Sequence, residues 1–163
     1  MKKTREPHLE KDWFTKAGLR SIVLKLPHPF NHRCGYVGVG KDNGFYGVEY
    51  NSIEQFFDVY GGLTFSGTLD RIDPDLYWFG YDCAHSRDKS FLNPNGIERT
   101  LDFCVEECEQ LSAQLVEESS VFLFYLWKRL GILSKERHNK MLACGIQDPS
   151  DEFVMRYINE NKI

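Results

Sequence analysis

The chain lacks both a long apolar run and a large excess of either charge. Its longest apolar segment is VFLFYLW, at residues 121–127, far short of the ~20 residues that cross a bilayer. Among 163 residues, 24 acidic and 20 basic side chains give a net charge of −4, so no general basic field attracts nucleic acid. We therefore predict neither membrane association nor general nucleic-acid binding.

The five cysteines lack the spacing of a metal site. Cys104 and Cys108 are the one close pair, a helical turn apart, whereas structural zinc takes about four close ligands. We predict no metal and no cofactor. The odd number of cysteines and the polar opening residues favour a reducing cytoplasm. Cysteines within apolar strands and on an inner helix face are expected to be packing groups.

Apolar residues in the second half recur with a helical period. They step by four, three, four, three and four from Ile97 through Leu101, Cys104, Cys108 and Leu111 to Leu115. This spacing predicts one long amphipathic helix. The opposite face carries Asp102, Glu106, Glu107 and Glu109, which we expect to be a solvated surface.

The first half has the shorter, glycine-punctuated pattern of a sheet. We expect strands at residues 21–26, 34–39, 63–66 and 76–82, after a short helix at residues 9–17 that Gly18 ends. Residues 52–59 fit a helix or an irregular connection equally well.

These patterns predict an α+β fold, in which a small, mostly antiparallel sheet packs against the long helix. A helical segment is added at the C-terminus. We expect one domain over residues 1–163, with an α+β core at 1–116 and a helical extension at 117–163. Residues 121–130 are apolar on nearly every side, which indicates either burial in the monomer or a homodimer contact.

The segment YGGLTFSG, at residues 60–67, combines paired glycines with two hydroxyls on alternate positions. Gly61 and Gly62 permit close approach of an anion or base, and Thr64 and Ser66 would share one face of a strand. The segment lacks the lysine of a phosphate-binding loop. A ligand floor and a plain tight turn into a strand both remain open.

The segment YDCAHSRD, at residues 81–88, places an acid and an imidazole at the end of an aromatic strand. Asp82 and His85 have the chemistry of a general acid-base pair, and with Asp88 they could also hold a metal. The structural alternative is that Asp82 caps the loop while His85 packs on a ring.

The run PHPFNHR, at residues 27–33, places His28, His32 and Arg33 before a glycine-rich strand, where they could contact an anion. Tyr36, Tyr60, Phe65 and Trp78 would supply aromatic walls. The predicted ligand-binding residues are Arg33, Tyr36, Gly61, Gly62, Thr64, Ser66, Trp78, Asp82, His85 and Asp88, with Asp82 and His85 as the candidate catalytic pair.

Four segments in order, HRCGYVGV, YGGLTFSG, WFGYDCAHSRD and VEECEQLSAQL, resemble an uncharacterised family of small hypothetical proteins encoded by bacteriophages and prophages. The resemblance covers residues 13–116. Tyr60 stands where the family is expected to have a histidine. The resemblance implies an accessory role in the cytoplasm of a bacterial host, such as countering a host defence.

Two functions are compatible with the sequence. One is a module that binds a small anionic or nucleotide-like ligand, or a host protein. The other is a small hydrolase or transferase that uses Asp82 and His85, with or without a metal. Binding is favoured because an enzyme normally carries a more complete nucleophile, metal or cofactor signature.

Overall fold

The computed structural model describes residues 6–130, except for the side chains of residue 55 and residues 120–130. In chain order, its elements are β1 (His8–Phe14), β2 (Arg20–Lys25), β3 (Arg33–Val39), α1 (Tyr50–Ile53), a 3-10 turn (Glu54–Phe56), β4 (Phe65–Leu69), β5 (Asp73–Asp82) and α2 (Leu101–Leu130). Of the predicted C-terminal extension, residues 117–130 belong to α2 and the rest lies outside the described residues. No helix in residues 6–130 is long and apolar enough to cross a membrane.

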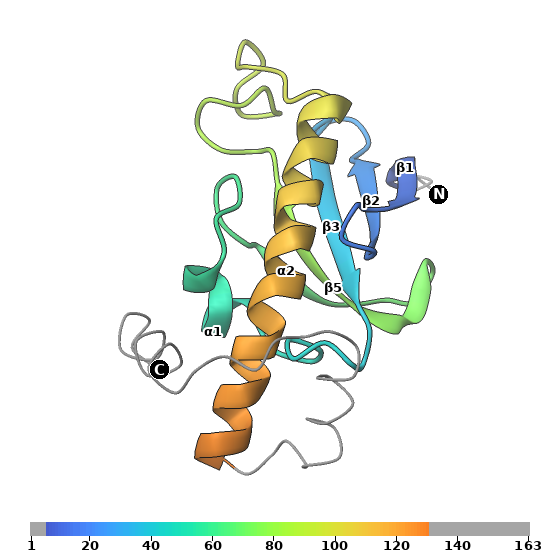
Figure 1. Ribbon diagram of the computed structural model, residues 1–163. Helices are drawn as coiled ribbons and strands as arrows, with labels where there is room; N and C mark the ends of the chain where they lie inside the picture. The colour runs from blue at the N-terminus through green and yellow to red at the C-terminus, as the bar shows by residue number, and fades with distance from the viewer. Residues whose placement is uncertain (1–5, 131–163) are drawn as a thin grey trace.

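The five strands form one antiparallel sheet in the order β1-β2-β3-β5-β4. Helix α2 runs along one face of this sheet, over β3 and β5 (Figure 1). The α+β architecture expected from the sequence is therefore present in its coarse form.

The core lies between α2 and the sheet. Alternate residues of β3 and β5 face the helix, among them Val37, Phe79 and Tyr81, which are at most 1% exposed. The helix meets them with the predicted inner face, of which Cys104, Cys108, Leu111 and Leu115 are completely buried. Each fully buried aliphatic side chain contributes about 1.5–3 kcal/mol, so this contact is the main support of the fold.

The helix predicted at residues 9–17 is wrong, because residues His8–Phe14 form the edge strand β1. Leu9 and Trp13 are four apart and match a helical period, but β1 pairs with β2 instead. The Trp13 indole donates to Glu109 of α2 at 3.0 Å, a long-range contact that local spacing does not reveal. Tertiary pairing thus overrides a short periodic signal.

Helix α2 begins at Leu101, not at Ile97 as its apolar period predicts. The Ile97 amide donates to the carbonyl of Arg87 at 2.8 Å, so Ile97 belongs to the preceding loop and is 54% exposed. The Thr100 hydroxyl accepts from the amide of Phe103 at 3.1 Å, as an N-cap does. The helix then continues without a break to Leu130.

The acidic face of α2 was expected to be solvated, but two of its four acids accept hydrogen bonds from loop backbones. Glu107 accepts from the amide of Tyr60 at 3.0 Å, and Glu109 accepts from the amide of Lys16 at 2.9 Å. Asp102 and Glu106 are exposed as predicted. The connections before β2 and β4 are therefore fastened to the helix by carboxylates.

The sheet is curled so that strands at its two ends approach each other. Arg20 of β2 pairs with Asp73 of β5 at 3.3 Å, and Glu6 pairs with Arg71 in the turn between β4 and β5. In Figure 1 the β4–β5 hairpin correspondingly bends toward the side of β1. Trp78, whose side chain lies on the face opposite α2, is also completely buried.

Candidate functional site

The structure brings the paired glycines and the Asp-His segment into contact. The backbone of Gly61 has φ of +69°, and a Cβ atom there would lie 1.8 Å from Nε2 of His85. The neighbouring Tyr60 ring meets the His85 ring edge-on at 5.3 Å. A side chain at residue 61 would therefore displace His85, and only glycine allows this close packing.

Asp82 and His85 are neighbours but do not form a hydrogen bond. Nε2 of His85 lies 3.7 Å from Oδ1 of Asp82, and it is buried without a hydrogen-bond partner. Oδ1 of Asp82 accepts from the amide of Ala84 at 3.1 Å. Asp82 thus makes the loop-capping bond of the structural alternative, while His85 retains one unsatisfied nitrogen.

Asp88 is the completely buried centre of this region. Its Oδ1 accepts from the Tyr60 hydroxyl at 2.6 Å and from Nε of Arg99 at 2.8 Å, and its Oδ2 accepts from the amide of His85 at 3.0 Å. Burial alone would raise the pKa of Asp88, but these hydrogen bonds outweigh burial and leave the pKa below its ordinary value. Asp88 is therefore a fixed carboxylate that orders the loop.

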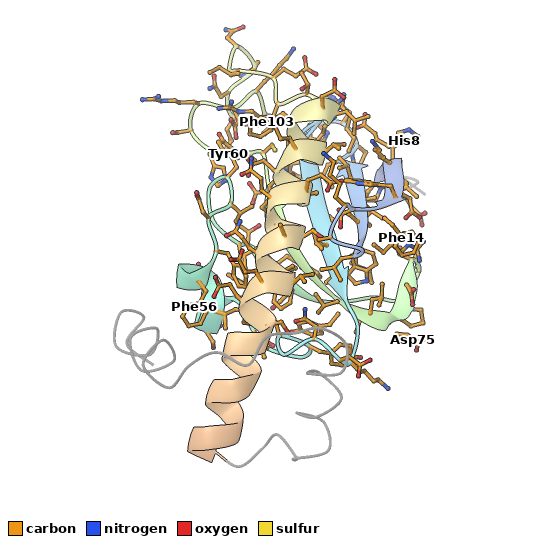
Figure 2. The ribbon with its side chains drawn as sticks, viewed as in Figure 1. His8, Phe14, Phe56, Tyr60, Asp75 and Phe103 are labelled. Carbon is orange, nitrogen blue, oxygen red and sulfur yellow. The ribbon has the colours of Figure 1, made fainter. Side chains whose placement is uncertain are left out.

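We call Tyr60, Gly61, Asp82, His85, Asp88 and Arg99 the polar corner. The Arg99 guanidinium lies 4.7 Å from the centre of the Tyr60 ring and 5.1 Å from that of Phe103 in α2. Figure 2 shows Tyr60 and Phe103 beside the first turns of α2. The polar corner thus joins three separate segments of the chain at one end of the helix.

A cleft of about 430 Å³ opens next to the polar corner. Its walls are the turn after β2 and the loop between β5 and α2. Arg99 belongs both to this cleft and to the polar corner. This volume lies in the range of small-molecule sites, roughly 300–1,000 Å³. The basic lining residues are Lys25, His32, Arg33, Lys89 and Arg99, with Glu98 as an acidic one.

The basic groups of the cleft differ in whether they already have partners. Arg33 pairs with Glu10 at 2.6 Å, and Arg99 pairs with Asp88. By contrast, neither Lys25 nor Lys89 pairs with a carboxylate of residues 6–130. Nδ1 of His32 is buried without a hydrogen-bond partner. The two lysines are thus free to contact a ligand, whereas the unsatisfied nitrogen of His32 is buried.

Two exposed aromatic rings stand at the rim of the cleft. Phe91 lines it and is 58% exposed, and Phe30 is 51% exposed. Their ring centroids are 6.4 Å apart, and Phe30 also meets His32 at 6.5 Å. The cleft therefore offers apolar aromatic surface next to unpaired positive charge.

A second hollow, of about 440 Å³, lies where the sheet curls and has a different character. Its charged residues are Asp12, Arg20 and Asp73, and they pair with one another. Phe14 and Asp75 mark this side of the molecule in Figure 2. Because its one cation, Arg20, is already paired with two acids, this hollow is the weaker candidate for an anionic ligand.

Arg33 is the one member of the predicted ligand-binding set that lines the first cleft, whereas Gly61, Asp82, His85 and Asp88 form the adjoining polar corner. Gly62 has φ of +83° with open space around it, and Thr64 is exposed. The segment 61–66 was predicted to contribute ligand-binding residues. None of its residues lines this cleft.

Three predicted residues lie on the sheet away from both sites. Tyr36 packs edge-on against Phe65 at 5.5 Å. Ser66 accepts from the amide of Tyr50 at 2.9 Å, and Trp78 is 0% exposed. Their polar and aromatic groups are therefore occupied by the fold.

Sequence reasoning did not select Lys25, Lys89, Phe91 or Arg99. Surface lysines are too common to mark a site, and the pairing of Arg99 with Asp88 depends on how the loop folds. His32 and Arg33, by contrast, were noted together as candidate anion contacts, and both line the cleft. Within residues 6–130, no three His, Cys, Asp or Glu side chains gather closely enough to hold a metal ion.

No protein-family model, curated protein or solved structure matches the chain. The resemblance to phage-encoded proteins thus stays a prediction.

Proposed function

We propose that the protein binds a small anionic, nucleotide-like ligand in the cleft of about 430 Å³. The observation that supports this function is the presence of two unpaired cations, Lys25 and Lys89, around a hollow that also presents the exposed ring of Phe91. A phosphate group and an aromatic base match these two kinds of surface.

The phosphate end of the ligand would be held by Lys25 and Lys89. Ammonium groups bind phosphate oxygens through charge-assisted hydrogen bonds, which are about twice as strong as neutral ones. Arg33 and Arg99 are fixed at the cleft by their ion pairs with Glu10 and Asp88, so the uncompensated positive charge comes from the two lysines.

The aromatic end of the ligand would lie against Phe91 and Phe30. Stacking of a base on an aromatic side chain contributes about 1–3 kcal/mol and does not depend on the identity of the base. The two rings are exposed and already hold an edge-on arrangement, so little side-chain entropy is lost on binding.

In a bacterial host this binding activity would serve a phage accessory role, namely the capture of a nucleotide-like signal used in host defence. The proposal of that role, and of a cytoplasmic location, rests on the sequence resemblance and on the character of the cleft. Capture requires no turnover. A host-protein partner is the competing kind of ligand, and titration with small anionic ligands separates the two.

The hydrolase or transferase alternative is supported by the unpartnered Nε2 of His85, 3.7 Å from Asp82. Against it, the same nitrogen is buried beside Gly61 and does not line the cleft. A general base must reach the proton that it removes. Binding without turnover is therefore the better-supported function.

Titration calorimetry of the full chain with pyrophosphate, ATP and a cyclic dinucleotide tests the proposal. The double variant Lys25→Ala/Lys89→Ala should bind about a hundredfold more weakly, since each lost charge-assisted contact costs at least about 1.4 kcal/mol. Lys16→Ala, an exposed lysine outside the cleft, is the matched control and should bind as the wild type does.

Either of two results would contradict this function. One is that the folded wild type binds none of the three ligands, which would favour the host-protein partner. The other is that the double variant binds as tightly as the wild type, which would place the ligand elsewhere. Ligand recovered after heat denaturation should be chemically intact, whereas an altered ligand would favour the enzymatic alternative.

A further inference from the structure

Two thiols lie in contact where the loop between β5 and α2 begins and ends. Cys83 directly follows β5, and Cys104 is in the first turn of α2. Their sulfur atoms are 3.7 Å apart. The loop between them carries Lys89, Phe91 and Arg99, three residues that line the cleft.

The backbones on both sides of this pair are fixed close together. The Tyr81 hydroxyl donates to the carbonyl of Cys104 at 2.8 Å, which ties the first turn of α2 to β5. The amide of Cys83 donates to the carbonyl of Arg33 at 3.0 Å. A disulfide needs a sulfur separation of about 2.0 Å, so rotation of the two side chains can supply most of the required approach.

Cys83 differs from the other described thiols in lining the cleft. Cys34 and Cys108 are buried and do not line it, and burial raises the pKa of Cys34 to about 12 and that of Cys108 to about 11. The hydrogen bond with Cys83 lowers the pKa of Cys104, and the nearby charge of Arg33 acts in the same direction. Cys104 is thus the more easily ionised thiol of the pair. The hydrogen bond with Cys104 and burial raise the pKa of Cys83, which is the member that lines the cleft.

We propose that Cys83 and Cys104 form an oxidation site that reacts with peroxides entering through the cleft. The thiolate of the pair attacks one oxygen of hydrogen peroxide, which breaks the O–O bond and forms a sulfenic acid and one water. The second sulfur then attacks the sulfenic sulfur, which forms the S–S bond and releases a second water. Two thiols and one hydrogen peroxide therefore yield one disulfide and two waters.

The disulfide would join the two ends of the loop that forms one wall of the cleft. Conversely, a ligand in the cleft would cover Cys83 and block the path of the peroxide. This second effect rests on the proposed binding function, whereas formation of the disulfide does not.

The test is to treat the full chain carrying Cys144→Ser with hydrogen peroxide and to map its peptides without reduction. Cys144 lies outside the described residues, and its removal leaves the four described thiols. We expect one cross-link, between Cys83 and Cys104, with loss of two hydrogen atoms. Cys34→Ser and Cys108→Ser should still form it, whereas Cys83→Ser should not.

A cross-link between other cysteines, or thiols that stay reduced while the fold remains intact, would overturn the proposal. ATP at about ten times its dissociation constant should slow cross-linking about tenfold, because only the unoccupied cleft admits peroxide. If ATP binds but does not slow cross-linking, peroxide does not enter through the cleft. If ATP does not bind, the binding function fails while the cross-link still decides the oxidation site.

Discussion

The polar corner and the cleft share one loop but use their polar groups in opposite ways. In the polar corner, the carboxylate of Asp88 accepts three hydrogen bonds and is completely buried. In the cleft, Lys25 and Lys89 have no carboxylate partner within the described chain, and Nδ1 of His32 is unsatisfied. One side of the loop is therefore occupied by folding, while the other is free to contact a ligand.

This difference shows how a motif can mislead about function. The residues that attract notice in the sequence, such as Gly61, Asp82 and Asp88, build the support of the site. The groups that remain available come from positions with no distinctive pattern. A buried, fully bonded carboxylate fixes the loop that carries Lys89 and Phe91, so the support and the binding surface depend on each other.

The largest expected effect is that of Asp88→Ala on stability. Removing this acid leaves Arg99 without its partner and the Tyr60 hydroxyl without its acceptor, so unfolding should become about 3 kcal/mol easier. Urea denaturation measures the change, with the exposed Asp75→Ala as the control, expected within about 0.5 kcal/mol of wild type. If stability were unchanged and binding were lost, Asp88 would be a ligand contact. The polar corner would then be part of the binding site.

Gly61→Ala and Gly62→Ala form a matched pair for the packing of His85. Both glycines have positive φ, but only at residue 61 would a Cβ meet His85. We expect a loss of about 2 kcal/mol for Gly61→Ala and about 1 kcal/mol for Gly62→Ala, the latter from backbone strain alone. If thermal or urea unfolding gave equal losses of stability for the two variants, the clash with His85 would not contribute to the effect.

Phe91→Ala tests the aromatic part of the cleft, and the adjacent Leu92→Ala is its control. Phe91 lines the cleft, whereas Leu92 is 90% exposed and does not line it. Loss of a stacking ring should weaken ATP binding about fivefold, while pyrophosphate, which has no base, binds as before. Calorimetry that finds the same loss for both ligands would argue against a base at this rim.

The smallest expected effect is the pH dependence of the Asp88 contribution. The pKa of Asp88 in the folded state lies below its ordinary value of 3.8. Its ionised form therefore stabilises the fold above pH 3.8, and this contribution is lost as the pH falls through the folded-state pKa. The stability difference between wild type and Asp88→Asn should be constant from neutral pH to about pH 5 and should shrink below pH 3.8. A difference that instead grows in acid has the wrong sign for this account.

Much of the fold could be predicted where the residues that form a local sequence pattern are also the residues that fill the core. β2, β3 and β5 have aliphatic or aromatic residues that also fill the core, and the inner face of α2 follows its apolar period from Leu101. β1 could not be predicted because Leu9 and Trp13 carry a helical spacing, while the contact of Trp13 with Glu109 is between distant parts of the chain.

The site was predictable to a smaller extent and for a similar reason. Paired glycines and an acid near an imidazole are unusual enough to be noticed in a sequence, and Gly61 and His85 do meet. Whether a lysine is paired depends on every acid that the fold brings near it. Lys25 and Lys89 therefore become distinctive only once the positions of the carboxylates are known.

The curl of the sheet also bears on how the molecule avoids assembling with itself. A flat antiparallel sheet exposes two outer strands whose free amides and carbonyls invite a neighbouring chain to add on. Here the outermost strands are β1 and β4, and Glu6, which precedes β1, pairs with Arg71, which follows β4. A second molecule extending the sheet would meet this charged border, which disfavours edge-to-edge growth.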